Sequence, residues 1–155
     1  MTHEAVRLPA LRHLDLHQYT SSWTQRGAAH MRGAARLVAA HAASLCTLYL
    51  RVWIRSRSKL YRELAALEDG FLESVLLAAP LPALRRLDLD VYWDGVDEAR
   101  CLEALRPLAR LSLPRLTRLS LWAGDATDQG VRWLQGAHLP ALRHLAVEEY
   151  GASKP

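Results

Sequence analysis

The stretch LPALRRLDL at residues 81–89 follows the pattern L-x-x-L-x-x-L-x-L, and this pattern recurs along the chain. Close copies are LPALRHLDL at residues 8–16 and LPALRHLAV at residues 139–147. A looser copy, LPRLTRLSL, lies at residues 113–121, and AASLCTLYL at residues 42–50 keeps only the last three leucines. Five copies in 155 residues identify a repeating unit, which has to be recognised before a fold is chosen.

Each copy predicts one β-strand, and a helical return leads to the next copy. Parallel strands joined by right-handed crossovers are the arrangement that such a strand and helix alternation requires. Because side chains in a strand alternate between two faces, the L-x-L leucines point to the interior and the residues between them to the other face. The expected strands lie near residues 12–17, 46–52, 86–91, 118–122 and 143–148.

The segments between the strands predict helices near residues 25–40, 60–79, 97–106 and 128–135. The second is expected to break near residues 68–70, and Pro107 stops or kinks the third because proline lacks a backbone N–H. Thr127 is expected to cap the fourth helix and Gly136 to end it. The sequence therefore predicts a single α/β domain over residues 1–155.

The segment GDATDQGVRWL at residues 124–134 resembles the n-x-i-T-D-x-G-x-x-x-L return of leucine-rich repeat proteins of the ribonuclease-inhibitor-like class. This resemblance implies a solenoid of about five repeats, with a curved parallel sheet on the concave face and helices on the convex face. It also implies a non-enzymatic scaffold that binds another protein through the concave sheet.

One feature departs from the family pattern, which continues L-x-L-x-x-N after the strand. This chain contains no asparagine, and the corresponding positions are Tyr19, Trp53, Tyr92, Gly124 and Tyr150. The four aromatic residues either stack as a ladder along the edge of the sheet or form an exposed stripe that grips a ligand. Both interpretations stay open at the level of sequence.

The residues between the strand leucines form three expected rows across the concave face. Arg51 beside Asp90 suggests a lattice of mixed charge, which is either a solvated surface or a binding surface with Arg, Tyr, Trp and Asp in one patch. The candidate binding residues are His13, Asp15, His17, Tyr49, Arg51, Arg86, Asp88, Asp90, Arg118, Ser120, Trp122, His144 and Glu148.

Three partner classes are compatible with these features. A protein bound on the concave face is favoured. The alternative is a structural or regulatory segment of a larger repeat protein, a partial array without end caps that stacks or self-associates through its open ends. Nucleic acid is least favoured; it would use the basic run from Arg51 to Arg62, which the acidic residues 88–98 of the next repeat would neutralise.

Signals for catalysis are absent from the sequence, since no phosphate-binding glycine loop, HExxH or GxSxG occurs. We therefore expect no enzyme and no cofactor. His13, Asp15 and His17 share a strand face but lie far apart for chelation, so we expect no metal. Cys46 and Cys101 form no metal-spaced pair, and no signal peptide or spanning segment is expected, which favours a cytoplasmic protein with reduced thiols.

Overall fold

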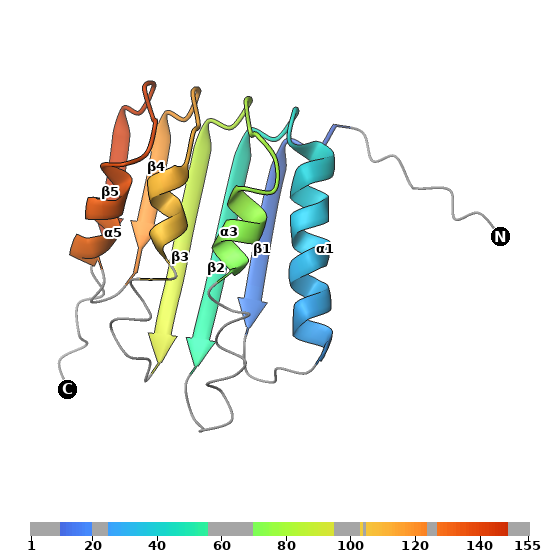
Figure 1. The fold of residues 1–155 in the computed structure, drawn as a ribbon. Helices are drawn as coiled ribbons and strands as arrows, with labels where there is room; N and C mark the ends of the chain where they lie inside the picture. Colours follow the sequence, from blue (N-terminus) through green and yellow to red (C-terminus); the bar gives the residue numbers. More distant parts are fainter. Residues whose placement is uncertain are drawn as a thin grey trace.

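The computed structural model describes residues 10–19, 25–55, 70–94, 103, 105–123 and 127–148 of the chain. Five parallel strands form one sheet in the order β1-β2-β3-β4-β5, so sequence neighbours are also neighbours in space (Figure 1). The strands are β1 (His13–Tyr19), β2 (Thr47–Arg55), β3 (Arg86–Asp94), β4 (Arg118–Trp122) and β5 (His144–Glu148). The expected parallel α/β sheet is confirmed.

The helical elements cover one face of this sheet and leave the other without a helix from the described residues (Figure 1). These elements are α1 (Gln25–His41), α3 (Phe71–Leu76), the 3-10 helix η1 (Arg106–Arg110) and α5 (Thr127–Leu134). We call the side of the sheet away from these elements the open face. It is the face on which the sequence places the candidate binding residues.

The hydrophobic core lies between the sheet and the helices. The L-x-L leucines of β2, β3 and β4 are at most 2% exposed, because alternation in each strand turns them toward the helices. Val38 of α1 and Val75 of α3 are buried against the same layer. Leu14 and Leu16 on β1 are only partly buried, and Leu145 on β5 is exposed. The core is therefore densest in the middle of the sheet and thins toward both edge strands.

The strands begin in one row because the backbone ties each strand entrance to the previous one. Two successive N–H groups at each new entrance donate to a single carbonyl oxygen just before the preceding strand, at 2.8–3.1 Å. The four accepting carbonyls belong, in chain order, to Arg12, Cys46, Arg85 and Thr117. These recurring bonds give all four strand pairs the same register. In that register the leucines of one strand lie beside the corresponding apolar residues of the next.

Several element boundaries differ from the sequence-based expectation. The first three strands extend past their expected ends, by two residues in β1 and by three in β2 and β3. These strands continue because the expected turns contain aromatic and aliphatic residues, which favour extended structure. Pro107 lies inside η1, within the segment where the third helix was expected to stop. The expected break near residues 68–69 and the segment 56–67 lie outside the described residues.

Gly136 follows α5 as expected, but for a different physical reason. Its φ lies outside the left-handed region that a glycine cap normally uses. A Cβ atom at this position would lie 3.2 Å from the carbonyl oxygen of Ala109 in η1, which is closer than an ordinary van der Waals contact. The absence of a side chain therefore permits the turn after α5 to approach η1 closely.

Candidate functional site

Strand pairing places the candidate binding residues in three horizontal rows on the open face. Neighbours in each row are directly paired in the register of the sheet, so the expected rows are confirmed. The rows are His13, Thr47, Arg86, Arg118, His144; then Asp15, Tyr49, Asp88, Ser120, Ala146; then His17, Arg51, Asp90, Trp122, Glu148. Strands of a sheet lie about 4.8 Å apart, which brings side chains of one row within reach of each other.

A network of three side chains from the second and third rows joins β2 to β3. The Arg51 Nε donates to Asp90 Oδ2 at 2.6 Å, and the Arg51 Nη2 donates to the Tyr49 hydroxyl at 2.6 Å. The Tyr49 hydroxyl in turn donates to Asp90 Oδ2 at 3.3 Å. The guanidinium carbon of Arg51 also lies 5.4 Å from the centre of the Tyr49 ring, within the range of a cation–π contact. The expected pairing of Arg51 with Asp90 is confirmed.

The electrostatics of this network follow from its partial burial. Burial of the Tyr49 hydroxyl raises its pKa, since the phenolate would lose hydration, and the neighbouring Asp90 adds to that effect. The hydrogen bond from Arg51 acts in the opposite direction on the same group. The hydrogen bond to Asp90 raises the pKa of Arg51, so the guanidinium stays charged. A charged donor and a neutral phenol are therefore fixed side by side.

Asp88 at the centre of the open face is buried, although alternation directs it away from the helices. Only 7% of this residue is exposed. Its Oδ2 accepts a hydrogen bond from the Arg86 Nε at 2.7 Å, so Arg86 pairs with an acid on its own strand. This pairing runs along β3 rather than across to a neighbouring strand, because Asp88 lies two residues from Arg86 on the same face.

Two carboxylate oxygens in this centre lack a hydrogen-bond donor among the described residues. They are Asp88 Oδ1 and Asp90 Oδ1, and both atoms are buried. Buried polar atoms are nearly always hydrogen-bonded, because an unpaired one costs about 1–3 kcal/mol. The two acids are consecutive members of the same strand face, so both acceptors belong to the centre of that face. The centre of the open face is thus prepared to accept hydrogen bonds.

At the β1 edge, His17 lies next to the same network. Its Nε2 lies 2.8 Å from Asp15 Oδ1, and its ring centre lies 5.8 Å from that of Tyr49. The histidine therefore links an acid on its own strand to the phenol on β2. His13 does not join this pair, and among the described residues no three His, Cys, Asp or Glu side chains are arranged to hold a metal ion.

Three of the aromatic positions lie within the strands, one step beyond the third row. Tyr19, Trp53 and Tyr92 are paired in register, because the first three strands extend through these positions. Strand alternation gives Tyr92 the same parity as Asp88 and Asp90, which places it on the open face. Tyr92 stacks against Trp122 of the third row, with ring centres 6.5 Å apart. The side chains of Tyr19 and Trp53 and the whole of Gly124 and Tyr150 lie outside the described residues.

Other candidate residues occupy the open face without joining these networks. Within the described part of the chain, His13, Arg118, Ser120 and His144 make no side-chain hydrogen bond or ion pair. The side chain of Glu148 is not among those described. The site therefore concentrates on β2 and β3, with Trp122 as its contribution from β4. Sequence reasoning found these residues but not the burial of Asp88 or the stacking of Tyr92 on Trp122.

No protein-family model, no curated protein and no solved structure matches this chain. In the part of the chain that the structure describes, none of the helices combines the length and the apolar character needed to cross a membrane. The interpretation of the site consequently rests on its own geometry.

Proposed function

We propose that this chain is a non-enzymatic, cytoplasmic scaffold that binds a partner protein through the open face of its sheet. We further propose that it is a leucine-rich repeat solenoid of the ribonuclease-inhibitor-like class, in which the open face is the concave one. The single observation that carries the proposal is the pair of buried, donor-free acceptors on Asp88 and Asp90 amid arginine and aromatic side chains.

The repeat assignment is supported by regularity in both backbone and sequence. Each of the four strand pairs has the same in-phase register, and each strand entrance uses the same pair of backbone hydrogen bonds to the strand before it. Repeats that each bury the apolar face of the next one produce this kind of nearest-neighbour architecture.

The composition of the site supports protein binding. Tyrosine, tryptophan and arginine are enriched among the residues that contribute most of the affinity in protein interfaces, and these residues cluster in well-packed, desolvated pockets. Tyr49, Arg51, Tyr92 and Trp122 are each partly buried, which leaves a portion of their surface available for contact. Internal hydrogen bonds and stacking hold these side chains in place, which lowers the entropy cost of ordering them in a complex.

Both oxygens are buried in the free chain, so a donor on the partner would reach them only when neighbouring side chains move aside, and it would then complete the site. A hydrogen bond to a charged carboxylate contributes about 1.5–3 kcal/mol when the alternative is an unpaired buried acceptor. The guanidinium of Arg86 lies beside Asp88, and half of the Arg86 side chain is exposed, so it lies at the surface through which a donor would approach. Backbone amides, amide side chains and cationic side chains of a partner could all supply the donor.

Affinity capture from an extract of the source cells tests this proposal. The immobilised chain is compared with Ser120→Arg, which places a large cation between Asp88 and the β5 strand without removing any described hydrogen bond. The helix-face double variant Arg32→Ala with Arg132→Ala is the control, since both side chains are exposed on helices. Supporting the proposal requires a protein that is captured by wild type and by the control and lost with Ser120→Arg. A protein retained equally by all three chains would count against the open face.

A second candidate function is favoured by the edges of the sheet. Leu145 on β5 is 45% exposed, whereas its register partner Leu119 on β4 is fully buried. On β1, Leu14 and Leu16 are also only partly buried. These apolar edges fit a segment that stacks on further repeats or on another copy of the chain. Sedimentation equilibrium over a wide concentration range tests it: a rise in mass supports edge association, and a constant monomer mass opposes it.

The basic run from Arg51 to Arg62 is the weakest candidate. Arg51, its first member, already donates to Asp90 and Tyr49, so its charge is engaged within the sheet. Residues 56–62 lie outside the described part of the chain. No geometric observation therefore favours nucleic-acid binding at this run.

A further inference from the structure

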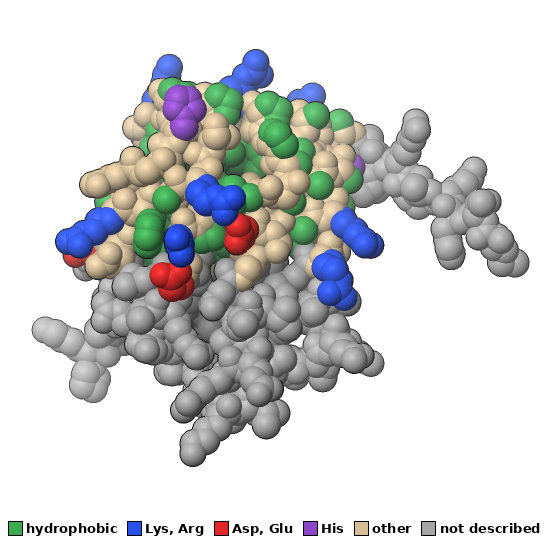
Figure 2. Space-filling model, viewed as in Figure 1, with side chains coloured by type: hydrophobic (Ala, Val, Ile, Leu, Met, Phe, Trp, Pro, Cys, Tyr) green, Lys and Arg blue, Asp and Glu red, His purple; other side chains and the backbone are tan. Residues whose placement is uncertain are grey.

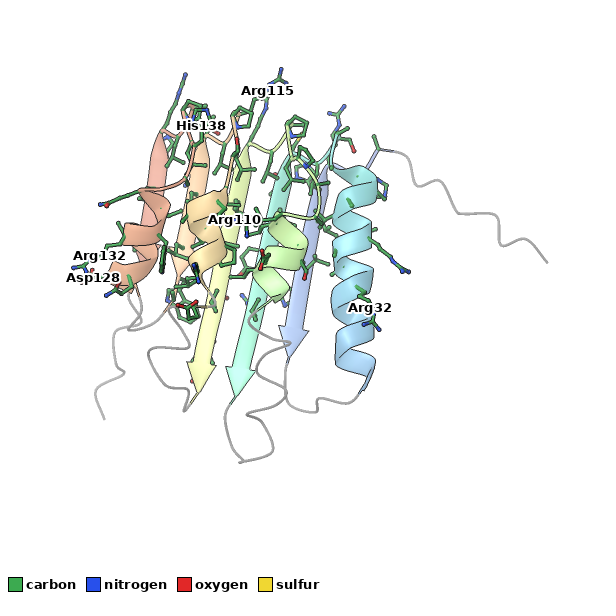
Figure 3. All side chains as sticks on the ribbon, in the orientation of Figure 1. Arg32, Arg110, Arg115, Asp128, Arg132 and His138 are labelled. Carbon is green, nitrogen blue, oxygen red and sulfur yellow. The ribbon has the colours of Figure 1, made fainter. Side chains whose placement is uncertain are left out.

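The edge of the sheet where the strands begin is strongly basic. Five turn and strand-entrance segments meet there, at residues 10–13, 41–47, 80–87, 112–118 and 137–145, and none contains an acidic residue. They contain six arginines and four histidines: Arg12, Arg85, Arg86, Arg115, Arg118, Arg143, His13, His41, His138 and His144. We call this set the basic edge. Figure 2 shows blue side chains projecting beyond this border of the molecule, and Figure 3 labels Arg115 and His138 on it.

The charges of the basic edge are largely free to act on a partner. All six arginines are exposed. Arg86 pairs with Asp88, but the other five make no ion pair or side-chain hydrogen bond within the described part of the chain. By contrast, two arginines on the helix side of the sheet are neutralised by acids: Arg106 pairs with Glu103, and Arg110 pairs with Glu73.

The fold brings these charges into a line. Arg12 precedes β1, Arg85 precedes β3, Arg118 begins β4 and Arg143 precedes β5, and the strand entrances are held in one row by the backbone bonds described above. Five strands at about 4.8 Å spacing give an edge about 19 Å long. That length corresponds to five or six base pairs of a duplex at about 3.4 Å per base pair. The row is therefore matched to an extended polyanion rather than to one small anion.

The residue types of the basic edge favour one class of polyanion over the others. Protein interfaces depend on aromatic or large apolar anchors, and binding of single strands depends on aromatic rings that stack on bases. The five segments of the basic edge contain no Phe, Tyr or Trp, and their leucines in the middle three strands are buried. Duplex nucleic acid needs neither kind of anchor, because its phosphates are bound mainly by charge and by arginine hydrogen bonds. A chain with a pI near 9.4 and six exposed arginines along one edge fits this mode.

We propose that the basic edge binds the phosphate backbone of double-stranded nucleic acid, without sequence preference. This surface is separate from the basic run considered above, and it does not depend on the proposed protein-binding face. Arg85, Arg115 and Arg143 lie outside the three rows of the open face, so their removal tests the edge alone.

Fluorescence anisotropy with an end-labelled 16-base-pair duplex, as DNA and as RNA, is the direct experiment. Wild type is compared with Arg85→Gln, Arg115→Gln and Arg143→Gln combined. The control combines Arg32→Gln, Arg36→Gln and Arg132→Gln, three exposed arginines on α1 and α5 that lower the formal net charge by the same amount. Arg32 and Arg132 are labelled on the helices in Figure 3, away from the basic edge.

The edge triple is expected to weaken duplex binding at least tenfold at 50 mM salt, while the control triple stays within threefold of wild type. The slope of log K against log salt is expected to fall in magnitude by about 2–3 in the edge triple, since each lost phosphate contact removes about 0.9. Circular dichroism and thermal melting check that both triples remain folded. Equal losses in the two triples would mean that net charge alone drives binding, and would overturn the proposal.

Two further probes separate this partner from its rivals. Polyglutamate of similar length and the isolated single strand are measured under the same conditions. Weaker binding of both than of the duplex supports the assignment. Polyglutamate binding as tightly as the duplex would instead assign the edge to an acidic polypeptide, and tighter binding of the single strand would contradict duplex recognition.

Discussion

Arg51 on β2 and Asp90 on β3 are paired in register, and the Arg51 Nε lies 2.6 Å from Asp90 Oδ2 on the open face. An ion pair of the same length, between Arg110 and Glu73, links η1 to α3 on the opposite side of the sheet. The two pairs differ in burial. Asp90 is 14% exposed and Arg51 33%, whereas Glu73 and Arg110 are 50% and 66% exposed. This contrast separates the effect of burial from the effect of distance.

Replacement of Arg51 by alanine is expected to destabilise the fold by about 1–3 kcal/mol, because Asp90 loses its charged donor while it stays largely buried. Replacement of Arg110 is expected to cost at most about 1 kcal/mol, since water screens an exposed pair. Urea denaturation of both variants measures the two free energies of unfolding. Equal losses would show that burial on the open face adds nothing to this pair.

The raised pKa of Tyr49 predicts a specific pH dependence. The ordinary tyrosine pKa is 10.0, and burial raises that of Tyr49 in the folded protein. A group whose pKa is raised on folding stabilises the fold below its unfolded pKa, and that stabilisation is lost as the pH rises through the folded value. The wild type should therefore lose stability relative to Tyr49→Phe above pH 10, and not below it.

Absorbance at 295 nm provides the measurement. Subtraction of the Tyr49→Phe titration from that of wild type isolates the Tyr49 phenol, and its midpoint should lie above pH 10. The same subtraction after denaturation in urea serves as the reference and should give an ordinary midpoint. A folded-state midpoint at or below the denatured one would refute the burial of this hydroxyl.

Gly130 and Gly33 offer a matched pair within helices. A Cβ atom at Gly130 on α5 would lie 2.7 Å from Cδ2 of the fully buried Leu121, so alanine there should destabilise by about 1–3 kcal/mol through overpacking. A Cβ atom at Gly33 on α1 meets nothing within 4 Å, and alanine there should stabilise by about 0.5–1 kcal/mol through helix propensity. Thermal melting compares them, and a shift of the same sign for both would contradict the packing of α5 on β4.

Leu119 and Leu145 test how far the core extends. They are direct partners in the β4–β5 register, yet Leu119 is fully buried and Leu145 is 45% exposed. Leu119→Ala should cost about 2–5 kcal/mol because it opens a cavity in the core. Leu145→Ala should cost less than about 1.5 kcal/mol, since much of its surface is already in water. Comparable losses measured by denaturation would mean that β5 is covered in solution, as in the edge-association alternative.

The register of the sheet was predictable because one short sequence pattern recurs in each strand. The spacing from Leu87 to Leu89, copied in each repeat, fixes which residues face the helices, and the backbone bonds at each entrance keep the copies aligned. The strand ends were less predictable. Residues such as Tyr92 and Trp93 continue the strand instead of turning, because aromatic residues favour extended structure.

Details of the candidate site depended on side-chain packing, which alternation alone does not specify. Parity placed Asp88 on the open face, but it could not show that the residue would be buried there or that Arg86 would pair along the strand. The stacking of Tyr92 on Trp122 joins two different rows and had no signal in the spacing. The basic edge was also missed, because its arginines are spread over four repeats and gather only when the strand entrances align.

Site-specific photo-crosslinking tests the proposed open-face function most directly. A benzoylphenylalanine is placed at Ser120 in the second row, and in separate chains at Ala40 on α1 and at Arg132 on α5, both exposed on the helix side. After irradiation in an extract of the source cells, the account predicts a defined protein adduct from position 120 that is absent from positions 40 and 132. Adducts that form only from positions 40 or 132 would contradict it.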